Sequence, residues 1–220
     1  KDITDYILAP RYYNPEIESE LEALQQTHEL VTVQELIDEG ILSISTGDEV
    51  GKLAYGTGNI PFVRTSDISN WEVKLDPKHG VSEEIYHSLA GKQDIREHDI
   101  LMVKDGTYLI GTCAILTKYD VKMVYQSHLY KLRILDKAKL SPFLLLAALS
   151  SNPVQRQIKS KRFTQDIIDS LGKRIYELVL PLPKDIAVRE RVSQMVEKVI
   201  EDRVEARELA RLACAEIVGE

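Results

Sequence analysis

The chain has 220 residues, with 28 basic and 35 acidic side chains, a formal net charge of -7 and 44% apolar residues. This is enough to bury one core and a second, smaller one. The longest apolar run, residues 143–149, is far shorter than the ~20 residues of a membrane helix, and no basic start precedes an apolar stretch. We therefore expect neither a membrane span nor a secretory signal.

The two cysteines, Cys113 and Cys214, lie far apart and show no CxxC or Cys/His ligand spacing. Neither a disulfide framework nor a zinc site is indicated, so we expect a reducing cytoplasm. The chain opens on Lys1 rather than on a methionine, which favours a fragment of a longer protein.

Charge is unevenly distributed along the chain. Residues 1–50 hold 12 acidic and 2 basic side chains, whereas residues 151–183 hold 6 basic and 3 acidic ones. Because affinity for phosphate depends on local potential, an acidic protein can bind nucleic acid through one basic face. The composition permits DNA binding and does not imply it.

The first predicted elements are two helices. An amphipathic helix is expected over 15–27, where apolar residues recur at spacings of 4 and 3. A short helix over 33–39 follows Thr32 as the N-cap candidate, with Glu35 at the capping-box position.

The middle of the chain alternates strands and turns. Strands are predicted over 41–46, 60–65 and 100–104, the last of them before an Asp-Gly turn. A helix over 82–90, capped by Ser82 and closed by Gly91, interrupts this pattern. Residues 109–117 and 121–135 are expected to form a strand pair.

The last third is mainly helical. A helix from Pro142 to about Lys159 is expected to kink or restart at Pro153, and a strand over 175–182 precedes a helix over 184–218. That helix carries apolar residues at heptad spacing with one interruption: Val192, Val196, Val199, Arg203, Ala206, Ala210, Ala213 and Ile217. We expect these apolar residues to be buried either against the chain's own domain, for example by the helix over 15–27, or against a helix of another protein.

Common catalytic motifs do not fit the sequence. Residues 56–61 begin like a dinucleotide loop, but Pro61 replaces the third glycine and a predicted strand follows. The sequence contains no GxxxxGK[ST], HExxH or GxSxG, and no [DN]PP[YF] of the amino-methyltransferase type. We therefore expect that any methyl transfer is performed by another protein or domain.

One carboxylate set leaves metal chemistry open. Asp67, Glu72 and Lys74 could hold Mg²⁺ and activate water, as in a nuclease. Such short combinations are also common by chance, and Trp71 beside them favours an amphipathic strand.

Three polar segments are candidates for recognition. Residues 64–67 follow an apolar strand, and residues 104–108 occupy a tip between two strands, where loops present side chains to ligands. Residues 155–164 are basic and contain no acid, which favours contact with phosphate. The alternatives are two ordinary turns and a solvated helix end.

At these residues the chain resembles the target recognition domains of type I restriction-modification specificity (S) subunits. The opening around Arg11 and Pro15 also resembles the junction in N6-adenine methyltransferases that carry a fused C-terminal recognition domain. The resemblance covers roughly residues 30–218. Its elements are residues 58–68, 99–103, Gly106, Ile110-Gly111, 126–128, Pro142, 167–171 and 179–183 before a long helix.

The resemblance implies an α+β fold: a mixed-sheet recognition domain over 30–183, preceded by a helical segment over 1–29 and followed by a coiled-coil-like spacer or dimerisation helix over 184–220. A full specificity subunit has two such domains and two long helices. This chain is therefore expected to be a half-subunit that dimerises or the DNA-reading end of a longer methylase.

The implied function is sequence-specific reading of double-stranded DNA, without catalysis, on behalf of an adenine methyltransferase and in some systems a restriction nuclease. S-adenosylmethionine is expected on that partner. The expected base contacts are Arg64, Lys104, Thr107, Tyr108, Gln126 and His128, and the expected phosphate contacts are Lys159, Lys161 and Arg162. Thr65 and Ser66 are also expected to contact DNA. The alternatives are a metal-dependent nuclease and a protein-interaction module built around the long helix.

Overall fold

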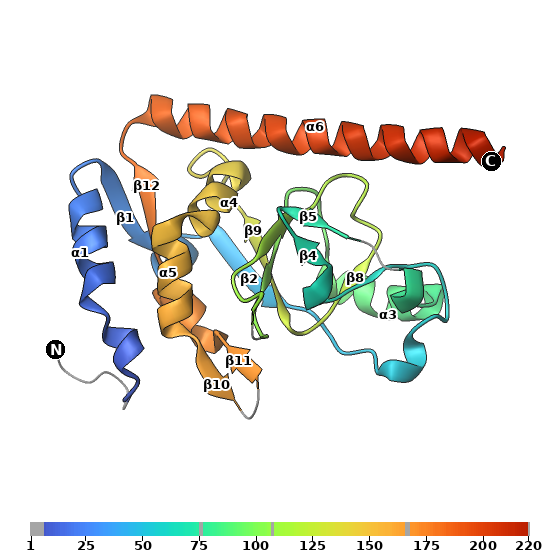
Figure 1. Ribbon diagram of the computed structural model, residues 1–220, viewed down its shortest axis with the longest axis horizontal. Helices are drawn as coiled ribbons and strands as arrows, with labels where there is room; N and C mark the ends of the chain where they lie inside the picture. Colours follow the sequence, from blue (N-terminus) through green and yellow to red (C-terminus); the bar gives the residue numbers. More distant parts are fainter. Residues whose placement is uncertain (1–6, 75–76, 107, 166–167, 220) are drawn as a thin grey trace.

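The computed structural model describes residues 7–74, 77–106, 108–165 and 168–219. Its α-helices are α1 (Pro15–Leu24), α2 (Val33–Asp38), α3 (Glu83–Gln93), α4 (Pro142–Ser150), α5 (Asn152–Lys161) and α6 (Ile186–Val218) (Figure 1). Short 3-10 helices are η1 (Pro10–Tyr13), η2 (Lys52–Ala54), η3 (Thr65–Asp67), η4 (Pro77–His79) and η5 (Gly172–Glu177). None of the described helices is long and apolar enough to cross a bilayer.

The strands are mostly short. They are β1 (His28–Thr32), β2 (Leu42–Thr46), β3 (Phe62–Val63), β4 (Ile68–Ser69), β5 (Glu72–Val73), β6 (Ile100–Val103), β7 (Cys113–Ile115), β8 (Val124–Tyr125), β9 (Leu129–Ile134), β10 (Phe163–Gln165), β11 (Ile168–Ser170) and β12 (Val179–Pro183). The largest sheet has the order β2-β9-β6-β7 and is antiparallel throughout.

Both faces of this sheet are buried at its two central strands, β6 and β9. In β6, Ile100 and Met102 join the main core, which also contains residues of α4, α5 and α6. The alternate residues Leu101 and Val103 join a second core with residues of β3, β4, β5 and β8. Because successive side chains of a strand point to opposite faces, β6 is apolar at every position.

Helices cover the first face of the sheet, and α6 lies across the molecule above α4 (Figure 1). Val196 and Ile200 of α6 are buried in the main core, whereas the C-terminal part of the helix is largely exposed. α1 packs beside α5, where Arg156 forms ion pairs with Glu16 and Glu20. β1 pairs with β12, so segments from both ends of the chain meet in one small sheet.

Several sequence predictions are confirmed. The fold is mixed α+β with a long terminal helix. α2 has the predicted capping box, in which the Thr32 hydroxyl accepts from the Glu35 N–H while the Glu35 carboxylate accepts from the Thr32 N–H. The predicted restart at Pro153 is the boundary between α4 and α5.

The predicted strand pair of residues 109–117 and 121–135 is wrong. β7 and β9 do not pair with each other but flank β6 on its two edges, and β8 pairs in parallel with β3. The hairpin that forms instead is β6–β7, across the Asp-Gly tip. Sequence proximity favoured the local pairing, whereas the backbone N–H and C=O groups of the buried strand β6 need a hydrogen-bonded strand on each edge.

Several element boundaries also differ from the prediction. The strand predicted over 60–65 is limited to β3, with η3 starting at Thr65, and α1 ends before residue 27. α3 continues through Gly91 to Gln93, because the Gln93 side chain donates to the Tyr125 carbonyl and accepts from its N–H, which anchors the last turn. The left-handed cap is Asp94, with φ of 41°. The predicted strand over 175–182 is shorter, since residues up to Glu177 belong to η5.

Candidate nucleic-acid interface

Several strand ends meet at one edge of the fold. β9 runs antiparallel to β2 and β6, so its first residues lie beside the last residues of both strands. The parallel pair β3 and β8 ends at the same place: the N–H of Gln126 donates to the Val63 carbonyl at 2.9 Å and that of Asp48 to the Tyr125 carbonyl at 3.1 Å. Loops that are distant in sequence are thereby brought together.

We call this area the strand-end surface. It is formed by Glu49, Arg64, Lys104, Asp105, Gln126, Ser127 and His128. The approach of the loops is close: a Cβ at Gly47 would overlap the carbonyl oxygens of Tyr125 and Gln126. Glycine at this position allows the loop after β2 to lie against the loop after β8.

Asp105 holds the strand-end surface together. Its carboxylate accepts from the Ser170 hydroxyl at 2.5 Å, and it lies 2.7 Å from Nδ1 of His128 and 3.3 Å from Nζ of Lys104. The side chain is only 12% exposed. Asp105 therefore fixes its neighbours and is not itself available to a ligand.

Glu49 is a second carboxylate on this surface, and it faces outward. The Ser127 hydroxyl donates to it, the Gln126 amide nitrogen lies 3.4 Å away, and Nε2 of His128 lies 3.8 Å away. Sequence reasoning missed Glu49: it lies three residues after the end of β2, and the neighbours that orient it come from a loop distant in sequence.

The structure brings together four of the residues predicted to read bases: Arg64, Lys104, Gln126 and His128. Arg64 is partly exposed and lies 3.8 Å from Asp67, which is buried and also accepts from the Arg64 N–H and the Ser66 hydroxyl. Ser66 is exposed and Thr65 is half-buried, so this turn is largely satisfied by its own polar groups.

The tip after β6 extends from the same surface. The N–H of Gly106 donates to the Asp169 carbonyl at 2.8 Å, which attaches the tip to β11. Tyr108 is 95% exposed. Thr107, the other predicted contact in this tip, lies outside the described residues.

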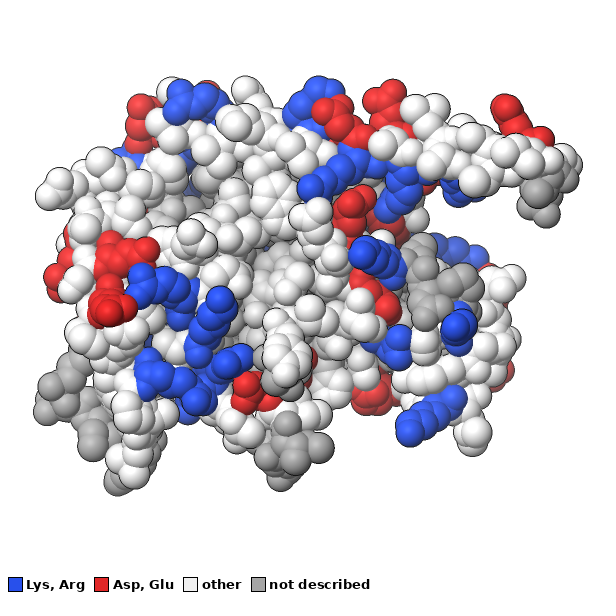
Figure 2. Space-filling view, in the orientation of Figure 1, with Lys and Arg blue, Asp and Glu red and all other residues white. Residues whose placement is uncertain are grey.

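A basic area adjoins the strand-end surface through the β10–β11 hairpin. We call it the α5 basic patch; it consists of Arg156, Lys159, Lys161, Arg162 and Arg174. Lys and Arg side chains gather over this part of the molecule, on the side away from α6 (Figure 2). β10 begins directly after Arg162, and β11 ends at Ser170, which donates to Asp105.

The three predicted phosphate contacts differ in their surroundings. Lys159 is exposed. Lys161 lies 2.7 Å from Glu177 and 4.5 Å above the Tyr12 ring, and Arg162 lies 3.4 Å from Asp169. Lys159 is therefore the most accessible of the three cations, since the Lys161 side chain is only 16% exposed and that of Arg162 35%.

Two aromatic rings, those of Tyr12 and Phe163, lie against cations of the α5 basic patch. Arg174 lies 4.7 Å from the Phe163 ring and donates to the Lys161 carbonyl at 2.9 Å. Tyr12 donates to Glu177 at 2.5 Å, and burial together with this carboxylate raises the pKa of Tyr12 well above its usual value. Tyr12 therefore stays neutral and adds no negative charge to the patch.

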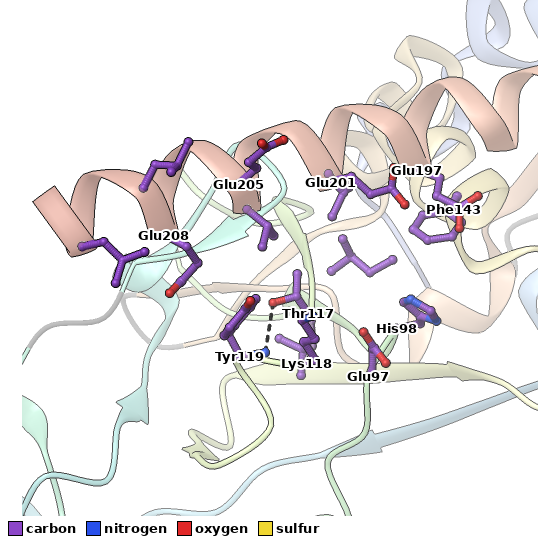
Figure 3. Close-up of a pocket in the computed structure, with 16 residues that line it drawn as sticks. Glu97, His98, Thr117, Lys118, Tyr119, Phe143, Glu197, Glu201, Glu205 and Glu208 are labelled. Carbon is purple, nitrogen blue, oxygen red and sulfur yellow. Dashed lines mark hydrogen bonds between the residues drawn. The ribbon is translucent and has the colours of Figure 1, made fainter.

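A groove lies elsewhere, between α6 and the loop after β7 (Figure 3). It encloses about 450 Å³, and its apolar lining includes Ile115, Phe143, Ile200 and Val204. Acidic residues line it along α6: Glu197, Glu201, Glu205 and Glu208. We call it the α6 groove; it contains none of the residues predicted to contact DNA.

The alternative metal set finds no support. Glu72 lies 4.0 Å from Arg203, whereas Asp67 is turned toward its own loop. In the described part of the chain, no group of three or more His, Cys, Asp or Glu side chains could hold a metal ion.

The sequence matches no protein-family profile and no curated protein. Comparison with solved structures places the fold in a class: it is that of type I restriction-modification S subunits. The match to the S subunit from M. genitalium has a TM-score of 0.54 and 14% identity, and covers 81% of this chain and 40% of the other.

Two further structures have the same fold. The HsdS subunit from Thermoanaerobacter tengcongensis matches at a TM-score of 0.50 and 17% identity, over 90% of this chain and 47% of that chain. A structure described as the basis of complex assembly and conformational transition of the type I R-M system matches at 0.50 and 15%, over 94% and 51%. The chain thus spans about half the length of the S-subunit chains it matches.

Proposed function

We propose that this chain is the DNA-reading half of a type I restriction-modification specificity module. The strand-end surface and the tip with Tyr108 enter the major groove of double-stranded DNA and contact base edges. The α5 basic patch contacts the phosphate backbone beside them. The chain performs no chemistry itself.

The observation that carries this proposal is the convergence of loops from distant parts of the sequence, next to a basic patch, at one edge of a sheet whose two central strands are buried on both faces. The loops of such a surface can change in sequence without any change in the core. It offers amide, imidazole and guanidinium groups, which form hydrogen bonds with base edges, and lysines that hold the backbone. The shared fold with S subunits supports the same assignment.

The proposed partners follow from this assignment. A methyltransferase subunit or domain, carrying S-adenosylmethionine as the methyl donor, modifies adenine at the site that this chain selects. α6 serves as a rigid spacer and docking element for that enzyme and for a second recognition half. The fold shared with type I S subunits supports these partners.

Salt-dependent DNA binding tests the proposal. The purified chain is expected to bind duplex DNA weakly, with an affinity that falls steeply between about 50 and 200 mM salt, because cations on the protein release counterions from the phosphates. Fluorescence anisotropy with labelled duplexes measures this. Affinity that is absent at low salt, or that does not change with salt, would contradict the proposal.

A further inference from the structure

Glu49 is oriented by three consecutive residues of another loop. The Ser127 hydroxyl donates to one carboxylate oxygen, and the Gln126 amide nitrogen lies 3.4 Å from the other. Nε2 of His128 lies 3.8 Å from the first oxygen. A side chain with this many neighbours on one side is restricted in its rotamers, yet 52% of it remains exposed.

The neighbouring acids of this surface are differently placed. Asp48 is paired with Lys92 and accepts from Gln93, and Asp105 is held by Ser170 and His128; both carboxylates are mainly buried. Glu49 has no Lys or Arg within ion-pair distance in the described part of the chain. Glu49 is thus an exposed, oriented carboxylate on the proposed reading surface.

A carboxylate in this position discriminates strongly between base edges. It is repelled by phosphates and by the acceptors of guanine and thymine, and only an exocyclic amino group offers it a hydrogen bond. On the cytosine base itself, the neighbour of N4–H₂ in the major groove is the non-polar C5–H edge, whereas adenine presents N6–H₂ beside its own N7 acceptor, which repels the second carboxylate oxygen.

We propose that Glu49 is a specificity-determining residue that selects cytosine at one position of the target by accepting a hydrogen bond from N4. This inference rests on the proposed DNA-reading function. Ser127 is a positioning residue that holds the carboxylate toward the groove. Gln126, next to Glu49, is then placed to contact the adjacent base pair.

Selection of bound duplexes from a randomised library tests the proposal. The parent is expected to enrich a motif with one essential cytosine. Glu49→Gln is expected to prefer adenine at that position, since an amide can bridge adenine N6 and N7, and Glu49→Ala to accept all four bases. Replacing the cytosine is expected to weaken binding by the parent roughly 10- to 100-fold, and binding by Glu49→Ala hardly at all.

Two further variants distinguish base recognition by Glu49 from a general effect of its charge and from an effect on folding. Glu84→Gln removes the same charge from an exposed position on α3 and is expected to keep the parental motif. Ser127→Ala is expected to lower the preference for cytosine over the other bases without changing which base is preferred. Circular dichroism confirms that each variant is folded.

The outcomes distinguish this inference from the proposed function. If the parent enriches a motif and Glu49→Gln enriches the same one with the same affinity, Glu49 merely holds its loop and the inference is wrong. If Glu49→Gln binds more tightly to every sequence alike, Glu49 only repels phosphate, which also overturns it. A parent chain that binds no duplex at low salt rejects the proposed function and this inference together.

Discussion

At the scale of single residues, Arg133 is the centre of a network of charged side chains with Asp94 and Asp99. Its guanidinium contacts both carboxylate oxygens of Asp99 at 2.7 Å and one oxygen of Asp94 at 2.6 Å. Asp99 is 1% exposed and Arg133 16%, so neither charge could be left without the other. The network fixes the last residues of β9 to the end of α3.

A pH dependence follows for Asp94. Hydrogen bonds from Arg133 and Arg96 lower the pKa of Asp94 from 3.8 to about 2. A carboxyl group whose pKa is lower in the folded state stabilises the protein above the unfolded pKa, and this stabilisation disappears as the pH falls through the folded value. We expect Asp94→Asn to lower the free energy of unfolding at neutral pH by about 1 kcal/mol at most, because the side chain is partly exposed.

Urea unfolding of the parent and of Asp94→Asn at several pH values measures this effect. The difference between them is expected to be constant above pH ~4 and to shrink from there toward pH ~2. Asparagine tolerates the left-handed backbone of position 94, so the variant changes charge and not conformation. A difference that persists unchanged at acid pH would contradict the assignment.

At the scale of elements, α5 and α6 use their surfaces in opposite ways. α5 presents cations on the side away from α6 and is held by α1 through Arg156. α6 packs on α4 and buries Val196 and Ile200, while Met195, Val199 and Ile217 of the helix are 63%, 39% and 85% exposed. α5 thus faces the proposed DNA, whereas the exposed part of α6 is available for contact with another molecule.

The α5 basic patch should contribute to binding without contributing to sequence choice. Replacing Lys159, Lys161 and Arg162 together by Ala is expected to weaken binding to all duplexes alike. The slope of log affinity against log salt should fall by about 0.9 for each phosphate that the variant no longer neutralises.

A matched control is the triple alanine variant of Lys198, Arg191 and Arg211, which removes three charges from α6. Equal effects of the two triple variants would remove the α5 patch from the proposed interface.

The second half of α6 should pair with another helix through its small residues. The predicted seam divides: Val192 and Val196 pack on the main core, whereas Ala206, Ala210 and Ala213 remain exposed. Ala210→Glu places a charge where a close helix–helix contact is expected, so it should abolish self-association or methyltransferase docking while leaving DNA binding intact.

Sedimentation velocity and co-purification with a methyltransferase subunit measure this. Ala187→Glu introduces the same side chain on the exposed first turn of α6, away from the seam, and should leave association unchanged. If Ala210→Glu and the parent show the same oligomeric state and the same docking, the seam has no intermolecular role.

For the molecule as a whole, recognition and catalysis should be separable. The purified chain with S-adenosylmethionine is expected to transfer no methyl group to DNA, because its sequence contains no [DN]PP[YF] tetrapeptide. Incorporation of labelled methyl groups into plasmid DNA measures this. A chain with the methyltransferase subunit added back serves as the positive control. Turnover by the chain alone would overturn the assignment.

The sequence was most informative where a structural signal is local. The capping box of α2 lies within four residues, and the restart at Pro153 depends on one proline, so both could be predicted. The arrangement of β7 and β9 could not, because it depends on which strands fill both edges of β6. Glu49 was missed for the same reason: its neighbours Gln126 and Ser127 are 77 and 78 positions away and meet it only after folding.

The double burial of the central strands has a consequence for how such a protein can change over time. The strands β6 and β9 provide nearly all of their side chains to the two cores, whereas the proposed reading groups lie in the loops beyond their ends. Folding and target choice are thus assigned to separate sets of positions. Substitutions in the loops can therefore change the target sequence at little cost in stability, whereas substitutions in the strands would disturb the packing of the cores.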